Sequence, residues 1–147
     1  MIKIKAFSEK NTEELIEMMR DFNKLDNYPF NKKITTKNLK FFLKNSHLGN
    51  IWVVEINKKL IGYIILTFCF SFEHKGQCAY IDEVYINAKY RNQGIGTETL
   101  KYIIRKSKKL KIKMLYLEVE KHNTRAASIY EKLGFKNNDR QFMTMKT

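Results

Sequence analysis

The first third of the chain changes from a strand-like to a helix-like pattern of hydrophobic residues. Residues 1–7 alternate apolar and basic side chains, which predicts a strand with one face in solvent. After Asn11 or Thr12, either of which is suited to cap a helix, apolar residues recur at helical spacing and predict an amphipathic helix. Turn-forming residues over 24–34 predict a loop, and a second, shorter helix is expected over 36–43.

The middle of the chain is rich in β-branched and aromatic residues and predicts three strands. Residues 51–56 and 60–72 flank a polar break at 57–59, a pattern typical of a hairpin. A third run follows over 77–86. The longest apolar run, 61–70, has about half the length of a membrane-spanning helix, so no membrane segment is expected.

The last third of the chain predicts how the sheet is completed. We expect a helix over 95–110, a strand over 114–120, a helix over 123–134 and a closing strand over 141–145. The helix over 95–110 is long enough to connect two parallel strands. The expected fold is α+β (mixed α/β), with a mostly antiparallel mixed sheet of about six to seven strands and about four helices in one domain over 1–147.

Composition and charge narrow the classes of protein to consider. With 147 residues, 44% of them hydrophobic and only one proline, the chain has neither a disordered nor a collagen-like composition. Its N-terminus turns polar at once, and its two cysteines have no partners at metal-ligand spacing, so a cytoplasmic protein with reduced thiols and no metal is expected. The net charge of +13 suits a polyanionic partner, but the lysines are scattered along the chain, so nucleic acid is not an expected partner.

A glycine-containing loop joins the strand over 77–86 to the helix that follows. In the segment 91–96, Gly94 and Gly96 allow a ligand to approach the backbone closely. Free amides at a helix start, together with the helix dipole, form an anion site suited to a pyrophosphate. The loop has neither the dinucleotide-binding nor the Walker pattern of glycines, and a simple tight turn is the alternative.

A second group of candidate residues, Asn123, Ala126 and Tyr130, lies in the last predicted helix. Ala126 and Tyr130 are four residues apart and therefore share one face of that helix. A small residue at 126 leaves room for a slim ligand, whose reactive end Tyr130 could hydrogen-bond. The alternative is that Tyr130 only packs and that Asn123 only caps the helix.

Together these two motifs resemble the GCN5-related N-acetyltransferase (GNAT) family. The resemblance rests on the run from Tyr90 to Thr97 and, about thirty residues later, on Asn123, Ala126 and the run Tyr130-Glu-Lys-Leu-Gly-Phe135. It is strong over 50–146 and implies the GNAT fold, acetyl-CoA as co-substrate and an acyl-CoA-dependent N-acetyltransferase. It also implies cofactor contacts, carried over to Val84, Tyr85, Ile86, Arg91, Asn92, Gln93, Gly94, Ile95, Gly96, Thr97, Asn123 and Ala126.

The resemblance also implies roles in the reaction. The loop amides would bind the pyrophosphate, the strand over 84–86 would pair with the pantetheine arm, and Tyr130 would protonate the departing thiolate. An amine attacks the thioester directly, so no nucleophilic side chain is needed, but its ammonium form must first lose a proton to a base.

Asp82 and Glu83 are the candidate bases. Neighbours in a strand point to opposite faces, so only one of them faces the substrate unless a bulge intervenes. The run over 80–83 resembles polyamine- and thialysine-type acetyltransferases, which implies Asp82 as the base and Glu83 as an amine-binding or structural partner. An ion pair with one of the many lysines is the alternative for each.

The acceptor is left open between two kinds of amine. We expect a primary amine of a small molecule such as a polyamine, an amino acid or an aminoglycoside. A protein or peptide N-terminus or lysine is the alternative within the same enzyme class. A catalytically inactive coenzyme A-binding regulatory module is the alternative outside it, and a homodimer is also left open. Acceptor choice is expected to depend on the N-terminal helices and variable loops over 23–48 and 70–77.

Overall fold

The computed structural model describes all residues from 1 to 147, which form two compact units, 1–117 and 118–147. The first unit contains β1 (Ile2–Ala6), α1 (Thr12–Leu25), α2 (Lys32–Lys44), β2 (Gly49–Ile56), β3 (Lys59–Ser71), β4 (Gly76–Ile86), α3 (Ile95–Lys109) and β5 (Leu115–Tyr116). The second contains α4 (Thr124–Lys132). The expected single domain stays a prediction.

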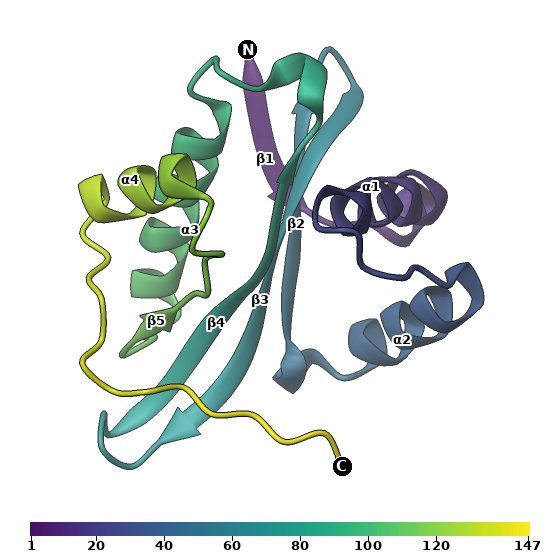
Figure 1. Cartoon of the computed structure of the whole chain (residues 1–147). Coiled ribbons are helices and arrows are strands. Elements are labelled where there is room, and N and C mark those ends of the chain that lie inside the picture. Colours follow the sequence, from purple (N-terminus) through teal and green to yellow (C-terminus); the bar gives the residue numbers. More distant parts are fainter. The chain divides into compact units, whose positions relative to one another are not determined.

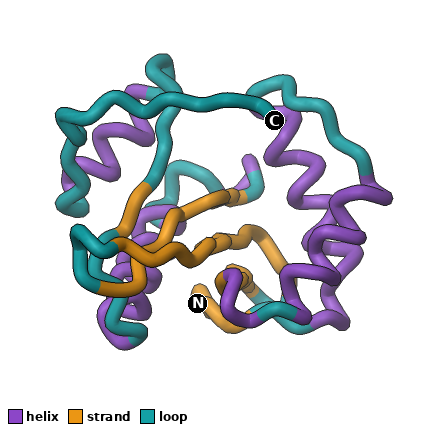
Figure 2. Tube along the Cα trace, turned by 90° about the horizontal axis from the view of Figure 1, so that it is seen from below, coloured by secondary structure: helices purple, strands orange, loops and turns teal.

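The first unit is built around a five-stranded mixed sheet. The strands follow the order β1-β2-β3-β4-β5, with antiparallel pairs up to β4 and a parallel pair between β4 and β5. Helices α1 and α2 cover one face and α3 covers the other (Figure 1). Seen from below, the strands form a layer between these helices (Figure 2). The predicted α+β class, hairpin and parallel crossover are therefore confirmed.

Both faces of the sheet are buried by apolar side chains from the helices. The stripe of α1 packs against Tyr63, Val53 and Tyr85 of the strands, and its Leu15 and Ile16 are fully buried. On the other face, fully buried side chains of the strands pack with Ile95, at the start of α3. Burying such side chains stabilises the fold by about 1.5–3 kcal/mol each, so this double layer holds the central strands rigidly.

The sheet is smaller than the sequence predicts. The strand expected over 114–120 is reduced to Leu115–Tyr116, and the expected closing strand over 141–145 is not formed. Alternation of side chains alone does not make a strand, because the backbone must also find a partner. β5 pairs only with Ala79 and Tyr80 of β4, and the residues over 141–145 belong to no ladder. The prediction of six to seven strands was therefore slightly too high.

The start of α2 and the cap of α1 differ from the sequence prediction. α2 begins at Lys32 rather than at 36, because the Oδ1 atom of Asn31 accepts a hydrogen bond of 3.0 Å from the Ile34 amide. The capping residue Asn31 was therefore assigned to the loop predicted over 24–34. Asn11 precedes α1 as expected, but its side chain makes no capping bond and donates instead to Glu14.

The cap of α2 can be tested by substitution. Asn31→Ala removes the acceptor for the Ile34 amide and is expected to lower the free energy of unfolding by about 1 kcal/mol. Asn38→Ala changes an exposed residue inside the same helix and is the matched control, expected to be neutral or slightly stabilising. Equal losses in chemical denaturation of the two variants contradict the assignment of Asn31 as the cap.

Candidate active site

A β-bulge in β4 sets the geometry of the candidate site. Ile65 of β3 lies opposite Glu83, whereas the next residue, Leu66, lies opposite Ile81. Asp82 is therefore the extra residue of the bulge and has no partner in the ladder. A bulge shifts the alternation of side chains by one residue, so the faces of Asp82 and Glu83 no longer follow from simple alternation.

Glu83 is held by a hydrogen bond from the neighbouring strand. The hydroxyl of Tyr63 donates to Oε2 of Glu83 over 2.8 Å. Burial raises the pKa of Glu83 to about 7, the bond from Tyr63 opposes this rise, and the nearby Asp82 charge adds to it. A carboxyl group with this pKa changes protonation near neutral pH, as a general base must.

Asp82 has a different environment. It is exposed and no hydrogen bond or ion pair of its side chain is found. Partial removal from water raises its pKa above the ordinary value. Asp82 thus lies next to the candidate base, but no neighbouring side chain fixes its direction.

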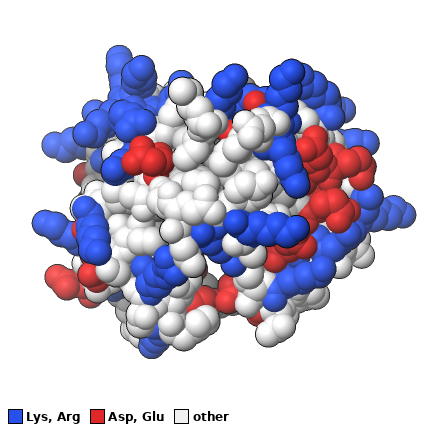
Figure 3. Space-filling model, turned by 90° about the horizontal axis from the view of Figure 1, so that it is seen from above, with Lys and Arg blue, Asp and Glu red and all other residues white.

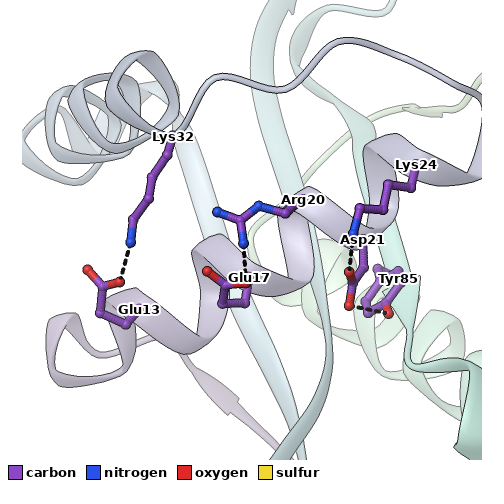
Figure 4. Close-up of polar contacts among 7 residues, drawn as sticks. All are labelled: Glu13, Glu17, Arg20, Asp21, Lys24, Lys32 and Tyr85. Atoms are coloured by element: carbon purple, nitrogen blue, oxygen red, sulfur yellow. Dashed lines mark hydrogen bonds and ion pairs between the residues drawn. The ribbon is translucent and has the colours of Figure 1, made fainter.

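A second tyrosine and carboxylate lie beside the first pair. The hydroxyl of Tyr85 approaches Oδ2 of Asp21, on α1, at 3.5 Å, and Lys24 lies 3.8 Å from the same carboxylate (Figure 4). The rings of Tyr63 and Tyr85 have centroids 5.8 Å apart. Burial raises the pKa of Tyr85, and Asp21 raises it further. The α1 face of the site therefore combines two phenols with two carboxylates.

The edge of β4 beyond the bulge has no strand beside it. The pairing with β5 covers only Ala79 and Tyr80, whereas Val84, Tyr85 and Ile86 pair with β3 alone. The Ile86 carbonyl accepts a hydrogen bond of 2.7 Å from Nε of Arg91, whose guanidinium group also lies over the Tyr85 ring. A free strand edge next to a carboxylate suits the expected pairing with an amide-containing arm.

The glycine loop leads into α3 as expected. Gly94 takes the left-handed conformation, with φ of +77°, and the first helical bond runs from the Glu98 amide to the Gly94 carbonyl. The amides of residues 95–97 precede that bond, and no side chain caps them. The Arg91 amide already donates to Ala88, so it is less suited to a pyrophosphate than the amides that follow. The loop thus fits an anionic ligand, and its role stays a prediction.

The second unit fixes Tyr130 by the way its helix ends. Gly134 has φ of +100°, its amide donates to the Glu131 carbonyl, and the Phe135 amide donates to the Tyr130 carbonyl. These bonds form a Schellman motif, in which the Tyr130 and Phe135 rings meet edge to face, 6.0 Å apart. Burial raises the pKa of Tyr130, so its phenol keeps its proton at neutral pH, as a general acid must.

The start of α4 gives Asn123 a structural role. Its Oδ1 atom accepts a bond of 3.1 Å from the amide of Ala126, which confirms the capping interpretation. Only its Nδ2 group is then left for the predicted contact with the cofactor arm. Ala126 and Tyr130 lie one turn apart on α4, as expected.

The sequence interpretation missed Tyr63 and Asp21. Tyr63 lies in an apolar run, where it looked like an ordinary core residue. The signal was its hydroxyl, because a buried tyrosine hydroxyl needs a partner and the next predicted strand, over 77–86, carries carboxylates. Asp21 lies on the first predicted helix, which is α1. Its approach to β4 was missed because it depends on tertiary packing.

Comparison with known proteins decides the family. The family model described as "Acetyltransferase (GNAT) family" matches residues 13–135. The chain belongs to this family. The acetyl-CoA-dependent acyltransferase class expected from the two motifs is thereby confirmed for this domain.

Individual relatives show how far the similarity extends. The bovine thialysine N-epsilon-acetyltransferase is 32% identical over 75 residues, which are 51% of this chain and 44% of that protein. The spermine/spermidine N(1)-acetyltransferase of Bacillus subtilis is 24% identical over 140 residues, 93% of this chain and 89% of that protein. The chain spans only 61% of the length of an archaeal N-acetyltransferase that it also matches.

Solved structures support the fold. A predicted acetyltransferase of Clostridium acetobutylicum, solved with acetyl-CoA, has a TM-score of 0.82 and 22% identity, with 99% of this chain and 96% of that one covered. This GNAT chain has no group of three or more histidine, cysteine, aspartate or glutamate side chains that could hold a metal ion. None of its helices has the length and apolar content needed to cross a membrane.

The basic charge of this GNAT chain does not mark one site. Lysine and arginine side chains are spread over the face seen in Figure 3 instead of gathering in one patch, and acidic side chains lie between them. The charge therefore does not single out a nucleic-acid surface on this face.

The raised pKa of Glu83 predicts a pH-dependent stability. Because this pKa is about 7 in the folded chain and ordinarily 4.5, the folded state binds more protons between these values. The free energy of unfolding of the wild type is therefore expected to fall, by up to about 3 kcal/mol, from pH 4.5 to pH 7 relative to that of Glu83→Gln.

Thermal or denaturant unfolding at several pH values measures this difference. Glu118→Gln, at an exposed position, is the control and should follow the wild type. A constant difference between wild type and Glu83→Gln across this pH range contradicts a raised pKa for Glu83.

Proposed function

We propose that this chain transfers the acetyl group of acetyl-CoA to the primary amine of a small molecule, by direct attack within a ternary complex. The observation that carries the proposal is the Glu83 carboxyl group, bonded to Tyr63 and placed beside the free edge of β4. An ammonium group must lose a proton before it can attack, and a carboxyl group that titrates near neutral pH is suited to accept it.

The proposed reaction needs one base and one acid. Glu83 takes one proton from the ammonium group and passes it to solvent, and the amine nitrogen then attacks the thioester carbon to form the C–N bond. The C–S bond breaks, Tyr130 gives its proton to the departing thiolate, and the second proton lost by the nitrogen restores the Tyr130 phenol through solvent. We assign the base to Glu83 and not to Asp82, because a hydrogen bond fixes the carboxylate of Glu83 and none fixes that of Asp82. The assignment to Tyr130 rests on the family resemblance and on its raised pKa.

The cysteines support direct transfer. Cys78 is fully buried, and burial raises the pKa of Cys69 above its ordinary value. A thiol must be accessible and ionised to act as a nucleophile, and neither cysteine meets both requirements. Neither cysteine is therefore suited to carry the acetyl group as a thioester between acetyl-CoA and the amine.

The proposed acceptor class follows from the site and from the relatives. Glu83, Asp82 and Asp21 gather negative charge on or near β4, which suits a cationic amine. Two of the relatives are named for small amines, thialysine and spermine or spermidine. We extend this class to the present chain.

Release of the coenzyme A thiol from acetyl-CoA tests the proposal. The amines to compare are polyamines, lysine, thialysine, aminoglycosides and short peptides. With the best amine at pH 8, Glu83→Gln is expected to lower kcat/KM about 10²–10⁴-fold, whereas Asp82→Asn changes it less than about tenfold. Tyr130→Phe is expected to lower kcat with little change in KM for acetyl-CoA.

Three outcomes argue against parts of this proposal. Turnover with peptides alone favours a protein or peptide acceptor. Binding of acetyl-CoA without turnover of any amine favours a regulatory coenzyme A-binding module. Loss of activity in Asp82→Asn with normal activity in Glu83→Gln moves the base to Asp82.

A further inference from the structure

We propose that Tyr63 is a positioning residue for the base, whose hydroxyl fixes one oxygen of the Glu83 carboxylate and favours its charged form. This inference rests on the proposed role of Glu83. It concerns a residue on β3, outside the two motifs that characterise the family resemblance.

The first argument is geometric. The Tyr63 side chain is fully buried, and its hydroxyl donates to Oε2 of Glu83 over 2.8 Å. Its ring is held between Phe22 of α1, at 6.4 Å between centroids, and Tyr85 of β4, at 5.8 Å. The ring therefore has little freedom to turn, and the position of the hydroxyl is set before any substrate binds.

The second argument concerns the proton. Burial and the Glu83 charge raise the pKa of Tyr63 far above its usual range, so this phenol only donates at working pH. A donor binds a carboxylate more strongly than a protonated carboxyl group, because the bond is charge-assisted. Tyr63 thus opposes the burial that favours the protonated form of Glu83, and it leaves the second oxygen, Oε1, to the acceptor amine.

Few other charges act on Glu83. Asp82 precedes it on β4 and raises its pKa. From α1, Asp21 approaches the hydroxyl of Tyr85 and is shared with Lys24. The guanidinium group of Arg91 lies over the ring of Tyr85, and its Nε donates to the Ile86 carbonyl. Tyr63 is therefore the side chain that contacts the base directly.

The experiment compares the titration of Glu83 in the full chain with and without this hydroxyl. Carbon-13 NMR of protein labelled at the glutamate carboxyl carbons follows Glu83, whose signal is identified by its loss in Glu83→Gln. The expected midpoint is about 7 in the wild type. In Tyr63→Phe it is expected to rise by about one pH unit, a tenfold smaller dissociation constant.

Tyr102→Phe provides the matched control. Tyr102 lies on α3, where its ring contacts Lys106, and the substitution removes the same single oxygen atom. Its Glu83 midpoint is expected to equal that of the wild type. An unchanged midpoint in Tyr63→Phe, or an equal rise in Tyr102→Phe, overturns the inference.

A measurement on the wild type guards against a variant that does not fold. With label at the phenol carbon of tyrosine, the Tyr63 signal is expected to shift with pH at the same midpoint as Glu83 and to lose this shift in Glu83→Gln. A Tyr63 signal that does not respond near pH 7 overturns the inference without any substitution at position 63.

The rate profile separates this inference from the proposed function. In Tyr63→Phe, the midpoint of the rise of kcat/KM with pH is expected to shift about one pH unit higher. The plateau of kcat/KM at high pH is expected to stay within about threefold of the wild type. If Glu83→Gln keeps full activity, the assignment of Glu83 as the base fails and the positioning role fails with it, although acetyl transfer itself stands. If Glu83→Gln loses activity and the midpoint of Tyr63→Phe stays in place, the inference alone fails.

Discussion

The single extra residue in β4 is the constraint on which the proposed chemistry depends. Counted from Ile81, before the bulge, strict alternation along β4 would place Glu83 on the face of Ile81. Because Asp82 is an unpaired extra residue, Glu83 lies instead on the face of Tyr85, two residues further along the strand. With the bulge, Glu83 reaches Tyr63 and shares the α1 side with Tyr85. The same strand ends its pairing with β5 just before the bulge, so the carboxylate and the free strand edge lie next to each other.

Burial at this position has opposite effects on stability and on function. Removing Glu83 from water raises its pKa to about 7, which costs stability at neutral pH when the group is charged. The same shift is what allows a carboxyl group to accept a proton from an ammonium group and return it to solvent. The surrounding core of α1, β3 and β4 offsets the cost, and the bond from Tyr63 limits it.

Much of the fold could be predicted from hydrophobic periodicity, because most elements bury one regular face. The helices around Leu15 and Leu100 and the hairpin around 57–59 followed from local patterns. The two C-terminal strands did not, since a strand depends on a distant partner that the pattern does not reveal. The segment over 141–145 alternates like a strand but lies outside the sheet.

For the site, the sequence supplied the parts and the structure supplied their arrangement. The glycine loop and the run around Tyr130 were recognisable because turns and helix ends have local signatures. The choice of the base between Asp82 and Glu83 could not be made from local patterns, because the register shift between β3 and β4 is a property of the two strands together. Tyr63 was hidden for the same reason, since its role appears only when the two strands lie side by side.

The most direct test of this account is the pH dependence of kcat/KM for acetyl transfer in the wild type and in Glu83→Gln. The account predicts that the rate of the wild type rises with pH through a midpoint near 7 and that this limb is absent from the residual rate of Glu83→Gln. A limb with the same midpoint in both proteins would show that another group is the base, and it would contradict the account.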